Sequence, residues 1–304
     1  MNRRRFAQSF AAAAAAVAAA APLTVKADGG AAAGGGGAPF GISIMLWTVF
    51  TKMPFEERLA RVAEAGYRNV QLVGEYRNWT DADFERANAA RKKLGIRFDC
   101  TAGLKHGVAD PAGRAALLDE LRAALEPMEK LECPAIIVTS GNVIPGMARE
   151  EQHACAIETL KQAAAVVEGR KIAGEPVRVL LENIDPEENP RFFMPSSAEC
   201  IEVVEAVNHP QVQFLYDLYH EQIAEGNLIE KLEKHIDTIG LIHVADVPGR
   251  HEPGTGEINY ANIYKKLAEL NYRRNIAMEF HPTGNDPVAT LRTARIEAWN
   301  AGAV

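Results

Sequence analysis

Cysteine is scarce in this sequence, with four in 304 residues, and this scarcity excludes a small disulfide-stabilised scaffold. Glycine recurs at no fixed period, which excludes a collagen-like fibre. No window holds roughly 18 consecutive bulky apolar residues, so no segment is expected to span a bilayer as a helix. Apolar residues make up 47% of the chain and charged residues 24%, which is typical of a globular enzyme.

Basic residues are fewer than acidic ones: 33 Lys and Arg stand against 40 Asp and Glu, for a formal net charge of −7. Four of the basic residues lie among the first 27 positions, where no acid occurs. The rest of the chain carries 29 basic and 40 acidic residues, and 29 minus 40 is −11. Such an acidic body lacks the positive surface that binds a phosphate backbone, so nucleic acid is not expected as a partner.

Residues 1–27 have the layout of an export signal. Arg3, Arg4 and Arg5 precede an alanine-rich stretch over residues 10–23, and small residues suited to cleavage follow at 25–27. Paired arginines before a weakly hydrophobic stretch are typical of twin-arginine signals. We therefore expect a periplasmic or exported protein that contacts the membrane only in transit. An alanine-rich helix or an uncleaved anchor is the alternative. Residues 28–39, which include four successive glycines, are predicted to be a linker, and residues 40–304 a single domain.

From residue 40 onward, short β-branched runs alternate with longer stretches of helical period, which predicts parallel βαβ units. Eight strands are expected, at residues 41–47, 69–73, 96–101, 135–139, 177–182, 212–217, 240–245 and 275–279. Helices are expected between them, at residues 55–65, 83–94, 114–131, 151–167, 198–207, 228–235 and 260–270. Ser196 and Glu199 are predicted to form a capping box. The four cysteines make no obvious pair and are expected to be free thiols.

About 265 residues in eight βα units match the usual size of an α/β fold of the (β/α)₈ TIM-barrel type. An open, doubly wound sheet is the alternative. The strand ends favour the barrel, because Glu182, Asp217, His243 and Glu279 each lie at or near the end of one of the last four predicted strands. A closed barrel directs consecutive strand ends toward one axis, whereas an open sheet spreads four of them over roughly 15 Å. Three carboxylates and an imidazole suit one divalent ion such as Mn²⁺, Mg²⁺, Co²⁺ or Zn²⁺.

Four segments resemble the signature blocks of hydroxypyruvate isomerases, a family of the xylose-isomerase-like barrels: LLENI at 180–184, YDLYH at 216–220, HVADVPGR at 243–250 and EPGTGEINY at 252–260. The resemblance extends from about residue 40 to the end. It implies that Glu182, Asp217, His243 and Glu279 bind the metal and that Glu182 and Glu279 also act as the acid/base pair. This chain departs from the family at His243, where glutamine is common, and at Gln71, where an acid usually ends the second strand.

Five further residues are candidates for substrate binding: His220, Arg250, Glu257, Trp47 and His106. Loops after barrel strands usually line the site, which favours a binding role. The alternatives are a solvent-facing helix residue for His220, a loop ion pair for Arg250 and a core aromatic for Trp47. The expected function is a metal-dependent isomerase or epimerase that acts on a small carbohydrate or hydroxy-carbonyl substrate. A phosphodiesterase resembling endonuclease IV and a non-catalytic exported sugar-binding barrel are the alternatives. The sequence leaves open the substrate, the metal and whether the chain forms a homo-oligomer.

Overall fold

The computed structural model describes residues 37–303. The predicted signal at residues 1–27 lies outside the described residues, as does the predicted linker up to residue 36, so both stay predictions.

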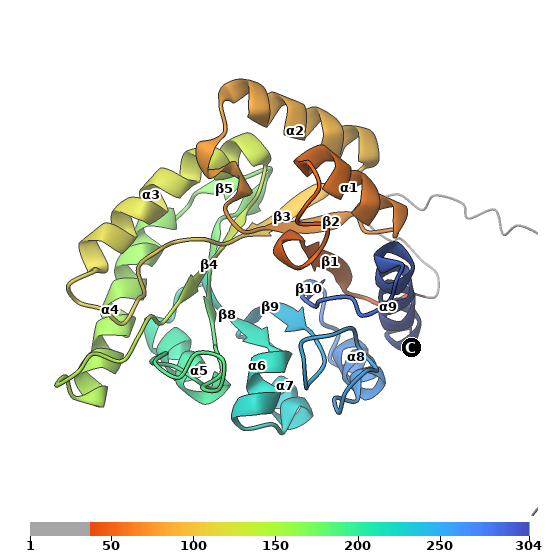
Figure 1. Ribbon diagram of the computed structural model, residues 1–304. Helices are drawn as coiled ribbons and strands as arrows, with labels where there is room; N and C mark the ends of the chain where they lie inside the picture. The colour runs from red at the N-terminus through yellow and green to blue at the C-terminus, as the bar shows by residue number, and fades with distance from the viewer. Residues whose placement is uncertain (1–36, 304) are drawn as a thin grey trace, which may run out of the picture. The chain divides into compact units, whose positions relative to one another are not determined.

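Eight parallel strands close into a barrel in the order β1-β10-β9-β8-β7-β4-β3-β2, with the helices arranged around it (Figure 1). The strands are β1 Gly41–Met45, β2 Asn69–Leu72, β3 Arg97–Thr101, β4 Ala135–Thr139, β7 Arg178–Glu182, β8 Val212–Asp217, β9 Ile239–Val244 and β10 Asn275–Met278. A short antiparallel pair, β5 Lys171–Ile172 with β6 Glu175–Pro176, precedes β7. Pairing of Gly41 with Asn275 closes the barrel, which confirms the predicted fold and excludes the open sheet.

The helices of the described chain follow the strands in the βα order that the sequence predicts. They are α1 Phe55–Glu64, α2 Asp81–Leu94, α3 Arg114–Leu131, α4 Arg149–Val167, α5 Ser197–Val207, α6 Leu218–Ala224, α7 Leu228–His235, α8 Tyr260–Glu269 and α9 Pro287–Ala301. Short 3₁₀ turns occur at Leu46–Thr48 and Glu75–Asn78. The seven predicted helices are confirmed to within two residues at each end, whereas α6 and α9 were not among them. No helix of residues 37–303 is long and apolar enough to cross a membrane.

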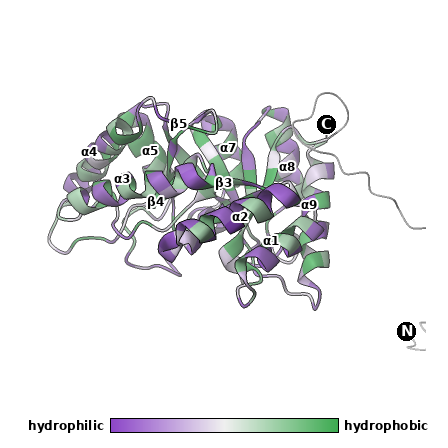
Figure 2. Ribbon diagram, turned by 90° about the horizontal axis from the view of Figure 1, so that it is seen from above, coloured by the Kyte–Doolittle hydropathy of each residue, from purple (hydrophilic) through white to green (hydrophobic). Residues whose placement is uncertain are grey.

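The core has two layers. Small and medium apolar side chains fill the barrel interior: Met45, Cys100, Ala135, Ile137, Leu180, Leu215, Leu241 and Ala277. A larger cluster lies between the strands and the helices and includes Tyr67, Phe98 and Leu267. The outer helices carry both hydrophilic and hydrophobic segments, as expected when one stripe packs on the sheet and the other faces water (Figure 2). All four cysteines are buried and free, as predicted.

The predicted capping box at Ser196 is wrong. Ser196 occupies the N-cap position of α5, but its side chain makes no capping hydrogen bond there. Glu199 does not complete the box either, because its Oε1 accepts from Arg149 Nε at 2.9 Å and its Oε2 makes no hydrogen bond among the described residues. A reciprocal capping box is found instead at the start of α2, between Thr80 and Asp83.

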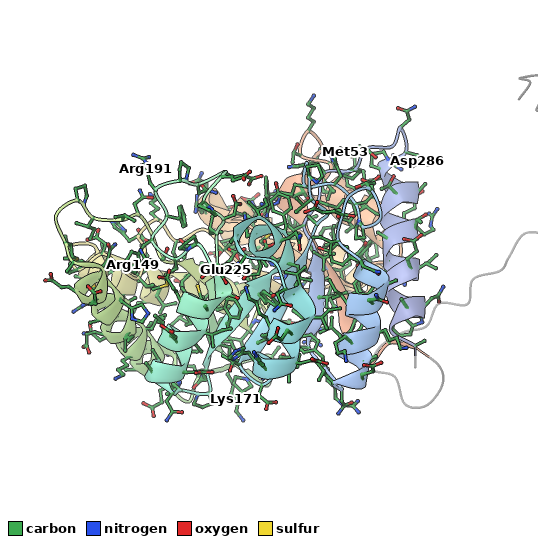
Figure 3. The ribbon with its side chains drawn as sticks, turned by 90° about the horizontal axis from the view of Figure 1, so that it is seen from below. Met53, Arg149, Lys171, Arg191, Glu225 and Asp286 are labelled. Carbon is green, nitrogen blue, oxygen red and sulfur yellow. The ribbon has the colours of Figure 1, made fainter. Side chains whose placement is uncertain are left out.

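The loops that follow the strands gather at one end of the barrel. Figure 3 shows Met53, Arg191 and Asp286, from the loops after β1, β7 and β10, at this end, with Lys171 of β5 at the opposite end. Parallel strands all finish at the same rim, so the residues at their carboxyl ends lie beneath these loops. The predicted site residues belong to this end.

Candidate active site

Glu182, Asp217, His243 and Glu279 meet at the carboxyl ends of the four neighbouring strands β7, β8, β9 and β10. One ligand atom of each lies within 4.8 Å of the others, and all four residues are buried. The Nδ1 atom of His243 is 2.7 Å from Glu279 Oε2, 3.3 Å from Glu182 Oε1 and 3.8 Å from Asp217 Oδ2. We call these residues the four-residue cluster.

Strand register explains why these side chains converge. Asp217 is paired with His243 across β8 and β9, and His243 is paired with Ala277 across β9 and β10. Glu279 lies one residue beyond β10, where its backbone N–H donates to Val244 O at 2.9 Å. The cluster is therefore positioned by backbone hydrogen bonds between strands, which are among the most rigid parts of a barrel.

Two cluster carboxylates have one oxygen that accepts hydrogen bonds from the protein and one that does not. Asp217 Oδ1 accepts hydrogen bonds from the backbone N–H groups of Tyr219 and His220, at 2.8 and 3.2 Å, and so caps α6. Glu279 Oε1 accepts a hydrogen bond of 2.6 Å from Trp47 Nε1. The second oxygens, Asp217 Oδ2 and Glu279 Oε2, are buried without a hydrogen-bond partner among the described residues.

His243 is arranged in the same way. Its Nε2 lies 2.9 Å from Gln71 Oε1, whereas its Nδ1 is buried and makes no hydrogen bond of acceptable geometry. Three buried polar atoms, from His243, Asp217 and Glu279, thus lack a hydrogen bond of acceptable geometry, although each lies within ion-pair distance of another charged group. Buried polar groups without hydrogen bonds are costly, and a bound cation would give all three a further partner. The donor set, with carboxylate oxygens and one imidazole, fits a divalent metal ion.

The electrostatics of the cluster favour positive charge. Burial opposes protonation of His243, but the carboxylates of Glu279 and Glu182 outweigh burial and raise its pKa to about 10. Burial also raises the pKa of Glu182. Glu279 differs, because Arg250 and His243 outweigh the effect of burial and hold its pKa below the usual range. The two glutamates therefore lie in opposite electrostatic environments within one site.

Arg250 lies over the cluster and is itself buried. Its Nη2 is 3.0 Å from Glu279 Oε2 and 3.5 Å from Asp217 Oδ2, and its Nη1 is 3.5 Å from Glu188 Oε2. Burial would lower the pKa of this guanidinium, but Glu279 and Asp217 outweigh burial and raise it. The guanidinium lies 5.6 Å from the ring centroid of Trp47, close enough for a cation–π contact. Trp47, 38% exposed, lies beside the cluster through its bond to Glu279.

His220 does not face solvent, which excludes the alternative of an exposed helix residue. It is buried at the start of α6, with Nδ1 2.5 Å from Asp185 Oδ2 and Nε2 3.1 Å from Arg250 Nη1. An arginine can only donate, so His220 Nε2 accepts from Arg250 and Nδ1 donates to Asp185. His220 and Arg250 thus form a polar pair next to Asp217.

The structure places the other two substrate-binding candidates apart from the cluster. His106 is on the loop after β3, where its Nδ1 lies 2.8 Å from Glu120 Oε1 and its side chain is 40% exposed. Glu257 accepts a hydrogen bond of 3.1 Å from Gln222 Nε2 and is exposed. No described contact joins either residue to the cluster, and their roles in substrate binding stay predictions.

Three acids of this end were missed by sequence reasoning. Asp185 holds His220, and Glu188 contacts Arg250 and Tyr219. Asp246 accepts four backbone hydrogen bonds from the loop between β9 and α8. Asp246 is part of the HVADVPGR segment, so its acidic character inside a signature block was the available signal. Asp185 and Glu188 carried no comparable signal, because an acid-rich loop is ordinary in sequence.

A cavity of about 600 Å³ lies elsewhere, between α8, α9 and the loop before α8. Its lining includes Pro253, Tyr264 and Glu297 and contains none of the predicted site residues. The candidate active site is assigned to the four-residue cluster and the loops around it, because these carry the carboxylates, the imidazole and the guanidinium that could bind a metal ion and a substrate.

Comparisons with known proteins identify the family of the chain. The sequence matches the family described as Xylose isomerase-like TIM barrel over residues 59–298. It is 30% identical to the 2-oxo-tetronate isomerase of Pectobacterium atrosepticum over 245 residues, which cover 78% of this chain and 90% of that protein. The hydroxypyruvate isomerase of Escherichia coli is 28% identical over 248 residues, covering 79% and 93%. Among solved structures, an AP endonuclease, family 2, from Brucella melitensis superposes with a TM-score of 0.73 at 28% identity, over 83% of this chain and 96% of that chain.

Proposed function

The chain belongs to the xylose isomerase-like TIM barrel family and is an isomerase, and from this premise we propose its reaction in more detail. The proposed substrate is a small hydroxy-carbonyl compound or keto sugar. Glu182 and Glu279 move a proton between carbon atoms through an enediolate, and the four-residue cluster holds one divalent metal ion. The relatives named as isomerases of hydroxypyruvate and 2-oxo-tetronate support this substrate class.

One observation carries the proposal: the carboxylates of two buried glutamates flank His243, with Glu279 Oε2 2.7 Å and Glu182 Oε1 3.3 Å from its Nδ1, and their surroundings raise the pKa of Glu182 and lower that of Glu279. Such a difference is how one site keeps an acid and a base at the same pH. One glutamate accepts the carbon-bound proton and the other supplies a proton to the neighbouring position.

The remaining residues bind and orient the substrate. Arg250 presents N–H groups beside the cluster, where they can bind a substrate oxygen, and His220 holds Arg250 in place by accepting a hydrogen bond from it. Trp47 holds Glu279 by its indole N–H and offers a partly exposed ring against which the C–H face of a sugar can pack. A divalent ion held by the cluster would supply a Lewis acid for the substrate carbonyl.

The structural similarity to an AP endonuclease raises a second candidate, a phosphodiesterase. Besides the four-residue cluster, the described chain has one further group with metal-ligand geometry: Asp185, Glu188 and His220. These side chains already pair with each other or with Arg250 and Tyr219, so they are not free to take a second ion. The net charge of −7 also disfavours binding to DNA.

The test combines a substrate panel with solvent exchange. The purified protein with Mn²⁺ is assayed against hydroxypyruvate, 2-oxo-tetronate and a set of keto sugars in D₂O, and NMR follows exchange of the carbon-bound hydrogen. We expect turnover with deuterium incorporation, and a loss of about 10² to 10⁴-fold in Glu182→Gln and Glu279→Gln. Glu168→Gln, on an exposed residue after α4, is the control.

Each other outcome of this assay has a clear meaning. Turnover without exchange would replace proton transfer by a hydride shift and leave the glutamates as ligands. Full activity in either glutamine variant would remove that glutamate from the acid/base pair. Binding of a sugar without any turnover would favour the non-catalytic alternative.

A further inference from the structure

The two ring nitrogens of His243 lie next to different groups. Nδ1 faces the carboxylates of the cluster, and Nε2 lies 2.9 Å from Gln71 Oε1. Gln71 is on β2, which is separated from β9 by β10 and β1 in the closed barrel. The contact therefore crosses the barrel interior. Both side chains are fully buried, so neither can exchange this partner for water.

A bulge in β3 places a third residue in the same interior. Val70 and Gln71 of β2 pair with Phe98 and Cys100 of β3, which leaves Asp99 as the extra residue. Bulges redirect side chains, and here the carboxylate of Asp99 reaches residues on strands that do not neighbour β3. The bulge is thus what brings this acid into the barrel.

Three donors converge on the Asp99 carboxylate. Ser43 Oγ donates to Oδ1 at 2.7 Å, while Asn275 Nδ2 and Gln71 Nε2 donate to Oδ2 at 2.7 and 3.4 Å. Asp99 is buried and has no ion-pair partner among residues 37–303. Its carboxylate is therefore hydrogen-bonded by these three neutral donors alone within the described chain. With its amide nitrogen committed to Asp99, Gln71 must present its carbonyl oxygen to His243.

The amide orientation decides the protonation pattern of the imidazole. A carbonyl oxygen can only accept, so His243 Nε2 must carry a hydrogen. In the neutral ring the lone pair is then on Nδ1, the nitrogen that faces Glu182 and Glu279. A glutamate at position 71 could accept from His243 but could not donate to Asp99. An amide is the side chain that links an N–H donor on one side to a carboxylate on the other.

We propose that Asp99 and Gln71 are positioning residues that hold His243 as the Nε2–H form, with Nδ1 directed into the four-residue cluster for a divalent ion. The part that concerns the ion rests on the metal site of the proposed function. The hydrogen on Nε2 does not, because the hydrogen bonds through the barrel interior set it. Outer partners of metal-binding histidines typically change metal affinity by about 10 to 100-fold.

The first measurement is spectroscopic. Protein labelled with ¹⁵N-histidine, with and without Zn²⁺, is studied by ring ¹H–¹⁵N correlation NMR, and His243 is assigned by the loss of its signals in His243→Gln. We expect a hydrogen on Nε2 in both states and, with Zn²⁺, a shift of Nδ1 to a metal-bound value. A zinc-loaded protein that carries the hydrogen on Nδ1 would overturn the proposal.

The second measurement is Zn²⁺ affinity by competition with a chelator. Gln71→Leu keeps the size but removes the acceptor, so affinity should fall by about 10 to 100-fold. Gln71→Glu combined with Asp99→Asn keeps an acceptor for His243 and a donor–acceptor pair between positions 71 and 99, and should retain most of the affinity and the Nε2 hydrogen. Gln213→Leu, on β8, is the matched control, because the carbonyl oxygen of Gln213 is buried without a hydrogen-bond partner among the described residues.

The outcomes separate this inference from the proposed function. Affinity of Gln71→Leu equal to that of the parent, or no recovery in the double variant, would overturn the positioning role. A parent that binds no Zn²⁺ but carries the hydrogen on Nε2 at a pH where the ring is neutral, with the hydrogen moving to Nδ1 only in Gln71→Leu, would support the arrangement of His243 and refute the metal site. If Gln71→Leu does not fold, the double variant still tests the proposal through the same two readouts.

Discussion

Asp217 uses its two carboxylate oxygens for different tasks. Oδ1 accepts the first backbone N–H groups of α6, and Oδ2 faces the four-residue cluster without a hydrogen-bond partner in the described chain. A helix begins at this point because β8 ends on a residue whose side chain is a good N-cap. One residue therefore joins the strand, the helix and the candidate metal site.

This division of tasks leads to a prediction for Asp217→Asn. Asparagine caps helices as well as aspartate, so the free energy of unfolding should change little. Its amide would replace Oδ2 and present hydrogens to the cation, so metal content should fall well below stoichiometric. Elemental analysis and urea unfolding measure the two effects. Asp217→Ala should lose the metal and also about 1 kcal/mol of stability. Stoichiometric metal in Asp217→Asn would remove Asp217 from the site.

At the scale of elements, the loop between β9 and α8 depends on one carboxylate. Asp246 Oδ2 accepts from the N–H groups of Gly254 and Gly256 at 2.8 and 2.9 Å, and Oδ1 accepts from Val247 and Ile258 at 3.0 Å each. At Gly256 a Cβ atom would lie 2.0 Å from Val247 O, so glycine is required for this close approach. The loop carries the buried Arg250, so its order matters for the site.

We predict that Asp246→Ala loosens this loop. Four backbone donors lose their acceptor, which should cost about 1 to 3 kcal/mol and reduce kcat/KM as Arg250 loses its fixed position. Hydrogen exchange should accelerate at Gly254 and Gly256. Asp246→Asn keeps one acceptor oxygen and should give an intermediate result. Unchanged protection of these two amides in Asp246→Ala would contradict this account.

The capping box of α2 shows how a local motif responds to pH. Thr80 Oγ1 accepts from the Asp83 N–H, and Asp83 Oδ2 accepts from the Thr80 N–H at 2.7 Å. Hydrogen bonds from Thr80 lower the pKa of Asp83 to about 2. A lowered carboxyl pKa means that the ionised form stabilises the folded state. This contribution is complete above the unfolded pKa of about 3.9 and is lost as pH falls through about 2.

Thr80→Ala should therefore have two linked effects. It should destabilise the protein by about 1 kcal/mol near neutral pH, because α2 loses its N-cap. It should also move the pKa of Asp83 up toward the ordinary value. Urea unfolding gives the first effect and an NMR titration of the Asp83 carboxyl the second. Thr80→Ser keeps the hydroxyl and should preserve both, whereas an unmoved Asp83 titration in Thr80→Ala would show that the cap does not set its pKa.

At the scale of the whole molecule, barrel closure makes the site. Pairing of β1 with β10 curves the last four strands around one axis and directs Glu182, Asp217, His243 and Glu279 to a common point. The same closure brings Trp47, just after β1, to Glu279, just after β10. Stability of the whole barrel and integrity of the site are consequently linked.

Export is a proposal at this scale, and it concerns residues outside the described part of the chain. The three arginines and the alanine-rich stretch of residues 1–27 predict passage through the twin-arginine route. A fusion of residues 1–40 to a folded reporter should reach the periplasm, as measured by fractionation. Changing Arg3, Arg4 and Arg5 to lysine should abolish transport. Retention of the unaltered fusion in the cytoplasm would refute export.

The sequence by itself determined the order of strands and helices and the four residues of the cluster. Apolar periodicity reports which faces are buried, and acids or histidine at consecutive strand ends must share one rim once the strands are parallel. These inferences need only local pattern and the rule that parallel strands finish together. The short α6 and the terminal α9 were not predicted, because their local signals were weak. The capping box at Thr80 was not predicted either, because the motif was assigned to Ser196 instead.

Only the tertiary structure decided which atom of each side chain faces the cluster and which residues hold it there. Gln71, Asp99 and Asn275 lie on strands far apart in sequence, and they meet because the barrel closes and β3 bulges. The tertiary structure likewise placed His106 against Glu120 rather than at the cluster. Sequence periodicity reports burial along one segment, whereas these hydrogen bonds depend on register and closure between segments. For this physical reason the sequence predicted which residues form the cluster but not how their side chains are oriented.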